Sequence, residues 1–169
     1  MNAGAYGGEM KNVLKEVTVL TKEGEVLVIP AKALELGYRT SVIPKNGWIV
    51  LGAVLQLKKG DQEQILARME ELKEQRITKQ RLDLPSAGST FKRPEGYFAG
   101  KLIMDAGLRG FTVGGAQVSE KHCGFVVNRG NATATDVWEL ICEVKRRVKE
   151  MTGVELEPEV KLLGDFPQR

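Results

Sequence analysis

The sequence predicts an α+β chain, with a β-rich first part and a more helical second part that meet near Gly60. Three observations indicate this class. Before Gly60, apolar residues alternate with polar ones, as they do along half-buried strands. After Gly60, apolar residues recur every three or four positions, which is the spacing of one helix face. Glycine and proline divide both parts into short segments, and no repeat is present.

The first part is expected to contain a hairpin and a short helix. Alternation from Lys15 to Leu20 predicts one strand, residues 26–29 predict its partner, and the turn between them lies at residues 22–25. A helix is expected over residues 31–36, because a proline precedes this segment and a glycine follows it.

A second tight turn and a long strand complete this part. Asn46 and Gly47 form the strongest hairpin signal in the chain, because both tolerate the positive φ angles of a two-residue turn. From Trp48 to Leu57, alternate residues are apolar, which predicts a long strand with one apolar face.

Two helices frame the second part. The first is predicted to begin at Asp61, whose spacing from Gln64 is that of a capping box, and to continue to about Gln75. The last is predicted to begin at Thr135 or Asp136. Its charged face is expected to be the solvent side, with phosphate binding as the less favoured alternative. Its apolar stripe consists of Val137, Leu140, Ile141, Val144, Val148 and Met151.

Between these helices the pattern is less regular. Residues 79–93 contain glycine and proline and are expected to be irregular. A short helix is predicted over Phe98–Ala106, and two short strands are predicted near Ala116–Ser119 and Phe125–Asn128.

Length and composition limit the possible functions. The 169 residues correspond to one domain or two small ones. The formal net charge of +3 is not concentrated in any block, which argues against a dedicated nucleic-acid binder. No apolar run approaches the ~18 residues of a membrane span, and the first residues lack the features of a signal peptide. Cys123 and Cys142 lack metal-binding spacing and indicate free thiols in a reducing, cytoplasmic setting.

Two segments carry residues suited to ligand binding. Residues 2–8 are rich in glycine, and such a backbone can approach a phosphate or a flat ring closely; a flexible arm is the alternative. Residues 85–94 combine two hydroxyls with Arg93 and lie near Lys79, so that they could bind an anion; a surface turn is the alternative. A serine-hydrolase triad is disfavoured, because there is no nucleophile-elbow motif and His122 is on another segment.

Two charged residues are open to either a site role or a structural one. Glu159 precedes an apolar run and could be partly buried at the start of a strand, where its carboxylate would need a partner or a raised pKa. The alternative is an exposed acid at a strand end. Arg39, in residues 37–41, could equally serve packing or the surface.

Together these segments resemble the UDP-N-acetylenolpyruvoylglucosamine reductase family, flavoenzymes that complete UDP-N-acetylmuramic acid for peptidoglycan. The short interval between Arg39 and Ser89 is similar to the family's second type, which lacks an inserted loop with a substrate-binding tyrosine. Two departures are Arg81, where the family usually has proline, and Cys123, where it often has alanine. The resemblance covers essentially the whole chain and rests on residues 1–9, 36–41, 85–91, 96–103, 114–119, 121–122, 131–136 and 156–160.

The resemblance implies a C-terminal portion of the reductase, because in the family the motif at Met1 follows an N-terminal FAD-binding subdomain that this sequence lacks. Residues 1–60 would be part of the FAD-binding domain, and residues 61–153 would be the substrate-binding domain. Residues 154–169 would form a C-terminal strand that returns to the first part. The retained FAD contacts would be Asn2, Gly4, Ala5, Tyr6 and Gly7.

The implied reaction is NADPH- and FAD-dependent reduction of the enolpyruvyl group of UDP-N-acetylglucosamine enolpyruvate. It would occur in the cytoplasm and support cell-wall synthesis, cell shape and cell division. By motif, Ser89 would donate a proton to the substrate carbon. Arg39 and Glu159 would stabilise the enol-like intermediate electrostatically.

The remaining implied contacts concern the substrate and the rest of the protein. Lys79 and Arg93 would hold the diphosphate, and His122 would also contact the substrate. No metal, membrane or nucleic-acid partner is implied, and the missing N-terminal part is the expected protein partner. The chain alone is not expected to be active. A non-redox UDP-sugar binding module and an inactive remnant are the alternatives.

Overall fold

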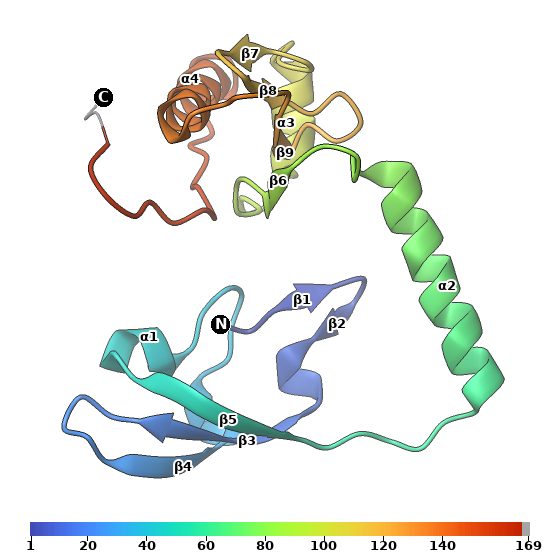
Figure 1. Ribbon diagram of the computed structural model, residues 1–169, viewed down its shortest axis with the longest axis vertical. Coiled ribbons are helices and arrows are strands. Elements are labelled where there is room, and N and C mark those ends of the chain that lie inside the picture. Colours follow the sequence, from blue (N-terminus) through green and yellow to red (C-terminus); the bar gives the residue numbers. More distant parts are fainter. Residues whose placement is uncertain (167–169) are drawn as a thin grey trace. The chain divides into compact units, whose positions relative to one another are not determined.

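The computed structural model describes residues 1–166 and divides into two compact units, Met1–Gln64 and a second that starts at Ile65 (Figure 1). Both units combine helices with antiparallel sheets, which confirms the α+β class. No helix within the described residues is long and apolar enough to cross a membrane.

The first unit contains two antiparallel sheets. In the larger one, the central strand β3 lies between β4 and β5 (Figure 1). Its small core centres on Val17 and Val19 of β3 and on Leu34, all of which are buried. The strands are β1 (Gly4–Ala5), β2 (Gly8–Glu9), β3 (Leu14–Leu20), β4 (Val26–Pro30) and β5 (Ile49–Leu55).

Short helices connect these strands, and two of them differ from the sequence predictions. The helix expected over residues 31–36 is the 3₁₀ turn η2 (Ala31–Leu34), which ends at Glu35 with φ 46°. Asn46-Gly47 does not form a hairpin; it ends the helix α1 (Val42–Asn46), with Gly47 at φ 65° as the C-cap. The positive φ that suits a two-residue turn also suits a helix C-cap, so that this pair alone does not distinguish the two structures. A second 3₁₀ turn is η1 (Met10–Asn12).

One face of the larger sheet is uncovered within the first unit. Every residue of β5 is exposed, and two register shifts interrupt its pairing with β3. On β4, Val26 and Val28 pair with alternate residues of β3, and each is 61% exposed, as is Ile49 of β5. Val54 extends the same apolar surface, which we call the open face: Val26, Val28, Ile49 and Val54.

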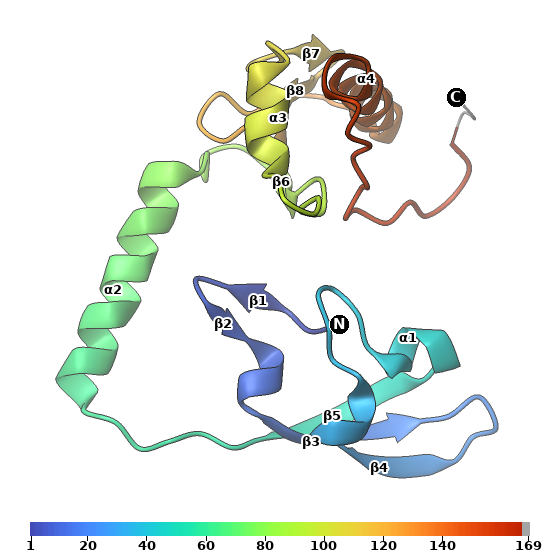
Figure 2. The same ribbon diagram turned by 180° about the vertical axis from the view of Figure 1, so that it is seen from behind.

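The second unit packs two helices against a four-stranded sheet of order β6-β9-β8-β7. Figure 2 shows the same ribbon from behind, with both helices labelled α3 and α4. The helix α4 packs against β7 and β8 and also contacts α3. The core between them includes fully buried Ile103, Leu140 and Val144. The elements are α2 (Gln62–Lys79), β6 (Ser86–Ser89), α3 (Ala99–Asp105), β7 (Thr112–Val113), β8 (Ala116–Val118), β9 (Phe125–Asn128) and α4 (Ala134–Thr152).

The two long helices confirm their predicted positions with different ends. The carboxylate of Asp61 accepts from the Gln64 amide (3.0 Å), as expected, but α2 continues beyond Gln75 to Lys79. The N-cap of α4 is Thr133 rather than Thr135 or Asp136, because Asp136 occupies the third helical position and completes a capping box.

The predicted stripe of α4 is buried at Leu140, Ile141, Val144 and Val148. Met151, at its end, is 53% exposed. The stripe is therefore buried up to the last turn of the helix.

Two segments differ from their expected secondary structure. Residues 79–93 include the strand β6, which the local pattern of small residues did not indicate. The strand expected over 154–169 is absent from residues 154–166, which make only one bridge, between Phe91 and Pro158. Pro158 lacks the amide hydrogen that a continuous ladder would need.

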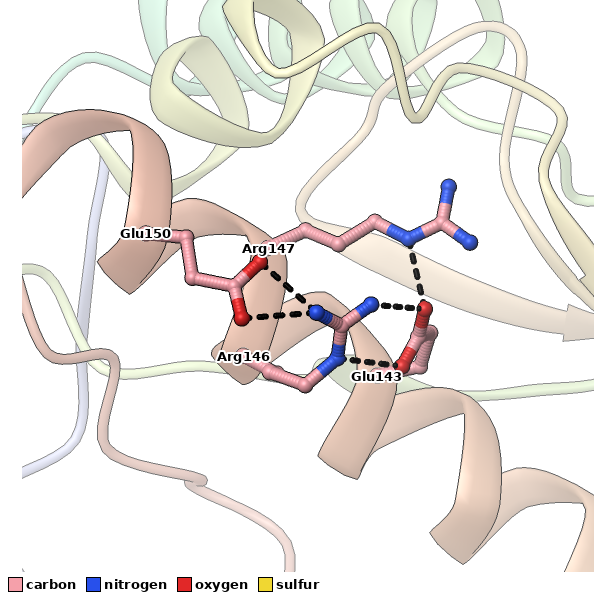
Figure 3. A network of polar contacts seen from close by, with 4 residues as sticks. All are labelled: Glu143, Arg146, Arg147 and Glu150. Carbon is pink, nitrogen blue, oxygen red and sulfur yellow. Dashed lines mark hydrogen bonds and ion pairs between the residues drawn. The ribbon is translucent and has the colours of Figure 1, made fainter.

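The charged face of α4 is internally paired (Figure 3). The carboxylate of Glu143 accepts from Arg146 (2.7 and 2.9 Å) and from Arg147 (2.6 Å), and Arg146 also reaches Glu150 (2.7 Å). The two guanidinium groups lower the pKa of Glu143 to about 2. The Arg147 guanidinium also stacks on the Phe111 ring at 4.4 Å, which joins α4 to the segment before β7.

Candidate functional site

Ser89 lies at the end of β6, where this strand bulges. Ser86 pairs with Val127 and Ser89 with Phe125, so that β6 holds one residue more than β9 across this interval. Gly88 takes up the extra residue with φ 88°, a conformation that glycine adopts at little cost. The Ser86 hydroxyl donates to a carbonyl of β9 (2.7 Å) and braces the bulge. The bulge directs Ser89 to the surface, where its side chain is exposed.

Glu159 is brought next to Ser89 by main-chain hydrogen bonds. Its amide donates to the carbonyl of Thr90 (2.8 Å), the residue that follows Ser89. Thr90 is buried, and its own amide donates to the carbonyl of Gly124 (2.9 Å). Thr90 is therefore held between β9 and the C-terminal segment, and two residues far apart in the sequence become neighbours. The Glu159 side chain is half-buried there.

His122 belongs to the same neighbourhood. Its Nδ1 accepts from the Gly124 amide (3.1 Å), and its ring lies edge-on to Phe125 at 4.9 Å. Neutral His122 in this arrangement carries its proton on Nε2, which is then a hydrogen-bond donor, and the residue as a whole is exposed. A Cβ at Gly100 would lie 3.1 Å from the Gly124 nitrogen, so that glycine allows the start of α3 to approach this loop.

Two cationic residues border these segments. The Arg93 guanidinium stacks on the Phe98 ring at 4.0 Å, and its Nε donates to the Tyr97 carbonyl (3.3 Å). Lys79 is the last residue of α2, and its Nζ is 3.5 Å from the Gln75 side-chain oxygen. Both side chains are exposed. The second unit thus combines a hydroxyl, a carboxylate and cationic or donor groups on neighbouring segments.

Arg39 lies in the first unit, in a two-residue turn. Gly37 and Thr40 exchange two main-chain hydrogen bonds of 3.3 Å, and Arg39 between them has φ 54°. A left-handed conformation is unfavourable for a residue with a side chain and is often found at functional sites. The Arg39 guanidinium lies 5.3 Å from the centre of the Tyr38 ring. The same unit holds buried Ser41, whose hydroxyl has no partner among the described residues.

The glycine-rich N-terminal segment forms the β1–β2 hairpin beside an open hollow of about 410 Å³. The turn is made by Tyr6 and Gly7, with φ 50° and 81°. The hollow is lined by Ala3, Gly4, Ala5, Gly8, Glu9, Met10 and Val13. Backbone therefore forms much of its wall, which suits contact with a phosphate or a flat ring.

Asn2 has a bracing position in this hairpin. It is 2% exposed, its amide nitrogen donates to the Glu9 carboxylate (2.7 Å), and its amide oxygen accepts from the Lys11 amide (2.9 Å). Lys11 and then Asn2 lower the pKa of Glu9. Asn2 therefore braces the hairpin that borders the hollow.

Three residues that contribute to the site were not predicted from the sequence. Thr90 and Gly100 shape its backbone, and Lys121 donates to the carbonyl of Ile77 in α2. Their contacts join segments distant in the chain, and no spacing rule connects them. The two cysteines are free thiols, and burial raises the pKa of Cys123, which makes a nucleophilic role for it unfavourable.

Comparisons with known proteins agree along the chain. Residues 80–163 match the family model "UDP-N-acetylenolpyruvoylglucosamine reductase, C-terminal domain". The chain is 64% identical to the reductase of that name from Lachnoclostridium phytofermentans, over 98% of this chain and 53% of the relative. It is 56% identical to the one from Clostridioides difficile, over 98% of this chain and 54% of the relative.

A solved structure gives the same result. The crystal structure of UDP-N-acetylenolpyruvylglucosamine reductase from Thermus caldophilus superimposes with a TM-score of 0.79 at 43% identity. The match covers 94% of this chain and 57% of that one. The chain thus spans about half the length of the curated relatives that it matches.

Proposed function

This chain belongs to the UDP-N-acetylenolpyruvoylglucosamine reductase family, and from that membership we propose that it is the substrate-binding, proton-donating portion of such a reductase. The reaction would convert UDP-N-acetylglucosamine enolpyruvate to UDP-N-acetylmuramate for peptidoglycan, in the cytoplasm. The observation that supports the proposal is the main-chain hydrogen bond from the Glu159 amide to the Thr90 carbonyl (2.8 Å), which joins the segment of Glu159 to the residue that follows Ser89 at the bulge.

Ser89 is proposed as the proton donor. Reduction of the enolpyruvyl double bond adds a hydride to one carbon and a proton to its neighbour, which carries the developing negative charge. A serine hydroxyl is a weak acid, so that the hydroxyl has to be held close to that carbon and the charge has to be stabilised by other groups. The braced bulge at Ser86–Ser89 supplies a rigid support for such a hydroxyl.

Arg39 and Glu159 are proposed to stabilise the enol-like intermediate. A guanidinium is suited to bind the substrate carboxylate in two places at once, and the turn at residues 37–40 presents that group on a short, hydrogen-bonded support. The Glu159 carboxylate would contribute its charge to the same stabilisation, near Ser89. Such preorganised charges act most strongly when the bound substrate excludes water.

Lys79, Arg93 and His122 are proposed to bind the diphosphate and sugar. Stacking on Phe98 limits the freedom of the Arg93 side chain, so that less entropy is lost when it binds an anion. The Nε2 of His122 would donate a hydrogen bond to a substrate oxygen.

The hollow beside the β1–β2 hairpin is proposed to hold part of an FAD group. FAD supplies the hydride of this reaction when it is bound, with NADPH as the source. Gly4, Ala5, Tyr6 and Gly7 would contact FAD through their backbone, and Asn2 would brace the hairpin. At Gly4 a Cβ would meet the Gly8 carbonyl at 3.2 Å, so that a side chain there would have to displace the hairpin slightly.

The test uses Ser89→Ala in this chain joined to the N-terminal portion that its relatives carry. Bleaching of the flavin by NADPH should proceed at nearly the parent rate, because Ser89 gives no proton in that step. Recovery of flavin absorbance on adding the enolpyruvyl substrate should slow by about 10²–10⁴-fold, as expected for loss of a general acid. Stopped-flow absorbance measures both steps.

Ser86→Ala is the matched control, because Ser86 lies in the same strand and its hydroxyl only braces the bulge. It should lower stability while it leaves the ratio of the two rates nearly unchanged. If flavin recovery in Ser89→Ala keeps pace with the parent, Ser89 is not the acid. If the chain binds the sugar nucleotide but no reduction occurs, a binding module is the better description.

A further inference from the structure

Lys121 closes the C-terminal end of α2. Its Nζ donates to the carbonyl of Ile77 (3.1 Å) and to the carbonyl of Gln80 (3.5 Å). The carbonyls of a helix's last turn have no amide partner within the helix, and the helix dipole places partial negative charge on them. An ammonium group from a distant segment therefore supplies hydrogen bonds to these carbonyls and compensates the negative charge at this helix end.

The rest of α2 has few contacts that could hold this end. Its apolar residues Ile65, Met69 and Ile77 are 48%, 61% and 44% exposed. Only Leu72 and Gln75 within α2 are half-buried, and no residue of the helix is buried. Because so little apolar surface is covered, a polar contact at one end has a large share in ordering the helix.

The position of Lys121 relates this contact to the candidate site. Ile77 and Gln80 flank Lys79, the residue proposed to bind the substrate diphosphate, so that Lys121 holds the backbone on both sides of it. Lys121 itself precedes His122, whose Nδ1 is bonded to the Gly124 amide. Lys121 is thus the direct connection between the turn that carries Lys79 and the loop that carries His122.

We propose that Lys121 is a positioning residue for substrate binding: it orders the last turn of α2 and thereby presents Lys79 to an anionic diphosphate. This inference rests on the proposed role of Lys79. It differs from a direct contact with the substrate, because it requires only the bonds of the Lys121 ammonium to the two carbonyls. Positioning and direct contact predict different results when Lys121 and Lys79 are changed together.

The first experiment measures order in the turn without any ligand. The amide of Gln80, which donates to the Arg76 carbonyl (2.9 Å), reports opening of the turn by hydrogen exchange. Lys121→Met keeps the aliphatic stem and removes the charge, and it should speed this exchange about tenfold. Lys121→Arg should restore most of the protection, because arginine also donates. Unchanged exchange in Lys121→Met would overturn the proposal.

Lys101→Met is the matched control for that experiment. Lys101 is an exposed lysine on α3 whose ammonium pairs with Asp105 on the same helix (2.8 Å). The substitution removes the same charge from the same unit and should leave exchange at Gln80 unchanged. Equal acceleration in both variants would mean that the effect follows net charge rather than the bond to α2, and it would also overturn the proposal.

The second experiment measures UDP binding by calorimetry in a double-mutant cycle. Lys121→Met should weaken UDP binding about tenfold in the parent chain but less than twofold in the Lys79→Met background. Losses that multiply independently would make Lys121 a direct contact and contradict positioning. If the unchanged chain binds no UDP, the proposed function of this unit fails, while the exchange experiment still decides whether Lys121 orders the turn.

Discussion

Replacing Gly115 by alanine is expected to destabilise the second unit by a purely steric route. A Cβ at this position would lie 2.5 Å from the Gly130 carbonyl oxygen, 2.6 Å from the Ala132 nitrogen and 2.7 Å from the Ala132 Cα. All three are backbone atoms, which cannot rotate away as a side chain can. The β7–β8 turn and the segment before α4 therefore have to separate.

The loss of stability in Gly115→Ala follows from the contacts that would weaken when these two segments separate. The Gly115 carbonyl accepts from the Arg129 amide (2.9 Å), and the Gly115 amide donates to the Asp136 carboxylate (3.4 Å). Asp136 also accepts from the Thr133 amide (2.9 Å) in the capping box of α4. Loss of about 1 kcal/mol for each of the two hydrogen bonds and the cap, with overpacking of similar size, gives about 4 kcal/mol.

Urea unfolding followed by fluorescence measures this cost in the right unit. Trp138 lies on α4, whereas Trp48 belongs to the first unit, so that a Trp48→Phe background reports the second unit alone. Gly107→Ala is the comparator, because it has no heavy atom within 4 Å of a Cβ and only a positive φ of 70°. Its strain should cost about 1 kcal/mol. If Gly115→Ala costs no more than Gly107→Ala, the steric argument is refuted.

Three further predictions concern charge and exposed surface. The lowered pKa of Glu143 stabilises the fold fully above pH 4.5, its ordinary pKa, and the contribution is lost as pH falls towards 2. Glu143→Gln should therefore lower the free energy of unfolding by about 1 kcal/mol at pH 7, a value already reduced for solvent screening. Near pH 2 the substitution should have almost no effect, and urea unfolding midpoints measured across pH test both expectations. Lys79→Ala or Arg93→Ala should weaken UDP binding by about 1–3 kcal/mol, and added salt should reduce this loss. If calorimetry finds the same affinity in both variants as in the parent, neither residue binds the diphosphate. The open face should cause concentration-dependent association of this chain, which Val28→Lys should reduce in light scattering; a clean monomer at high concentration would contradict this.

Local sequence patterns predicted those elements in which the spacing of apolar side chains marks the buried face. The stripe of α4 repeats with the helical period over about four turns, and β9 has the apolar residues of a buried strand at the expected positions. The capping pair of α4 was misplaced because Thr133, Thr135 and Asp136 all have N-cap chemistry. Packing and the bond from Asp136 to Thr133 select the first of them.

The amino-acid sequence by itself determined the fold class, the long helices, most strands and the residue types of the candidate site, because periodicity, capping and motif order lie within short stretches of chain. The tertiary structure alone decided that Glu159 bonds to Thr90, the residue after Ser89, that β6 bulges between Ser86 and Ser89, and that Lys121 reaches α2. These contacts are made by or to backbone amides and carbonyls, which every residue possesses. A hydrogen bond to a carbonyl many residues away leaves no signature in the residue that provides it, so that only the folded chain identifies the pair.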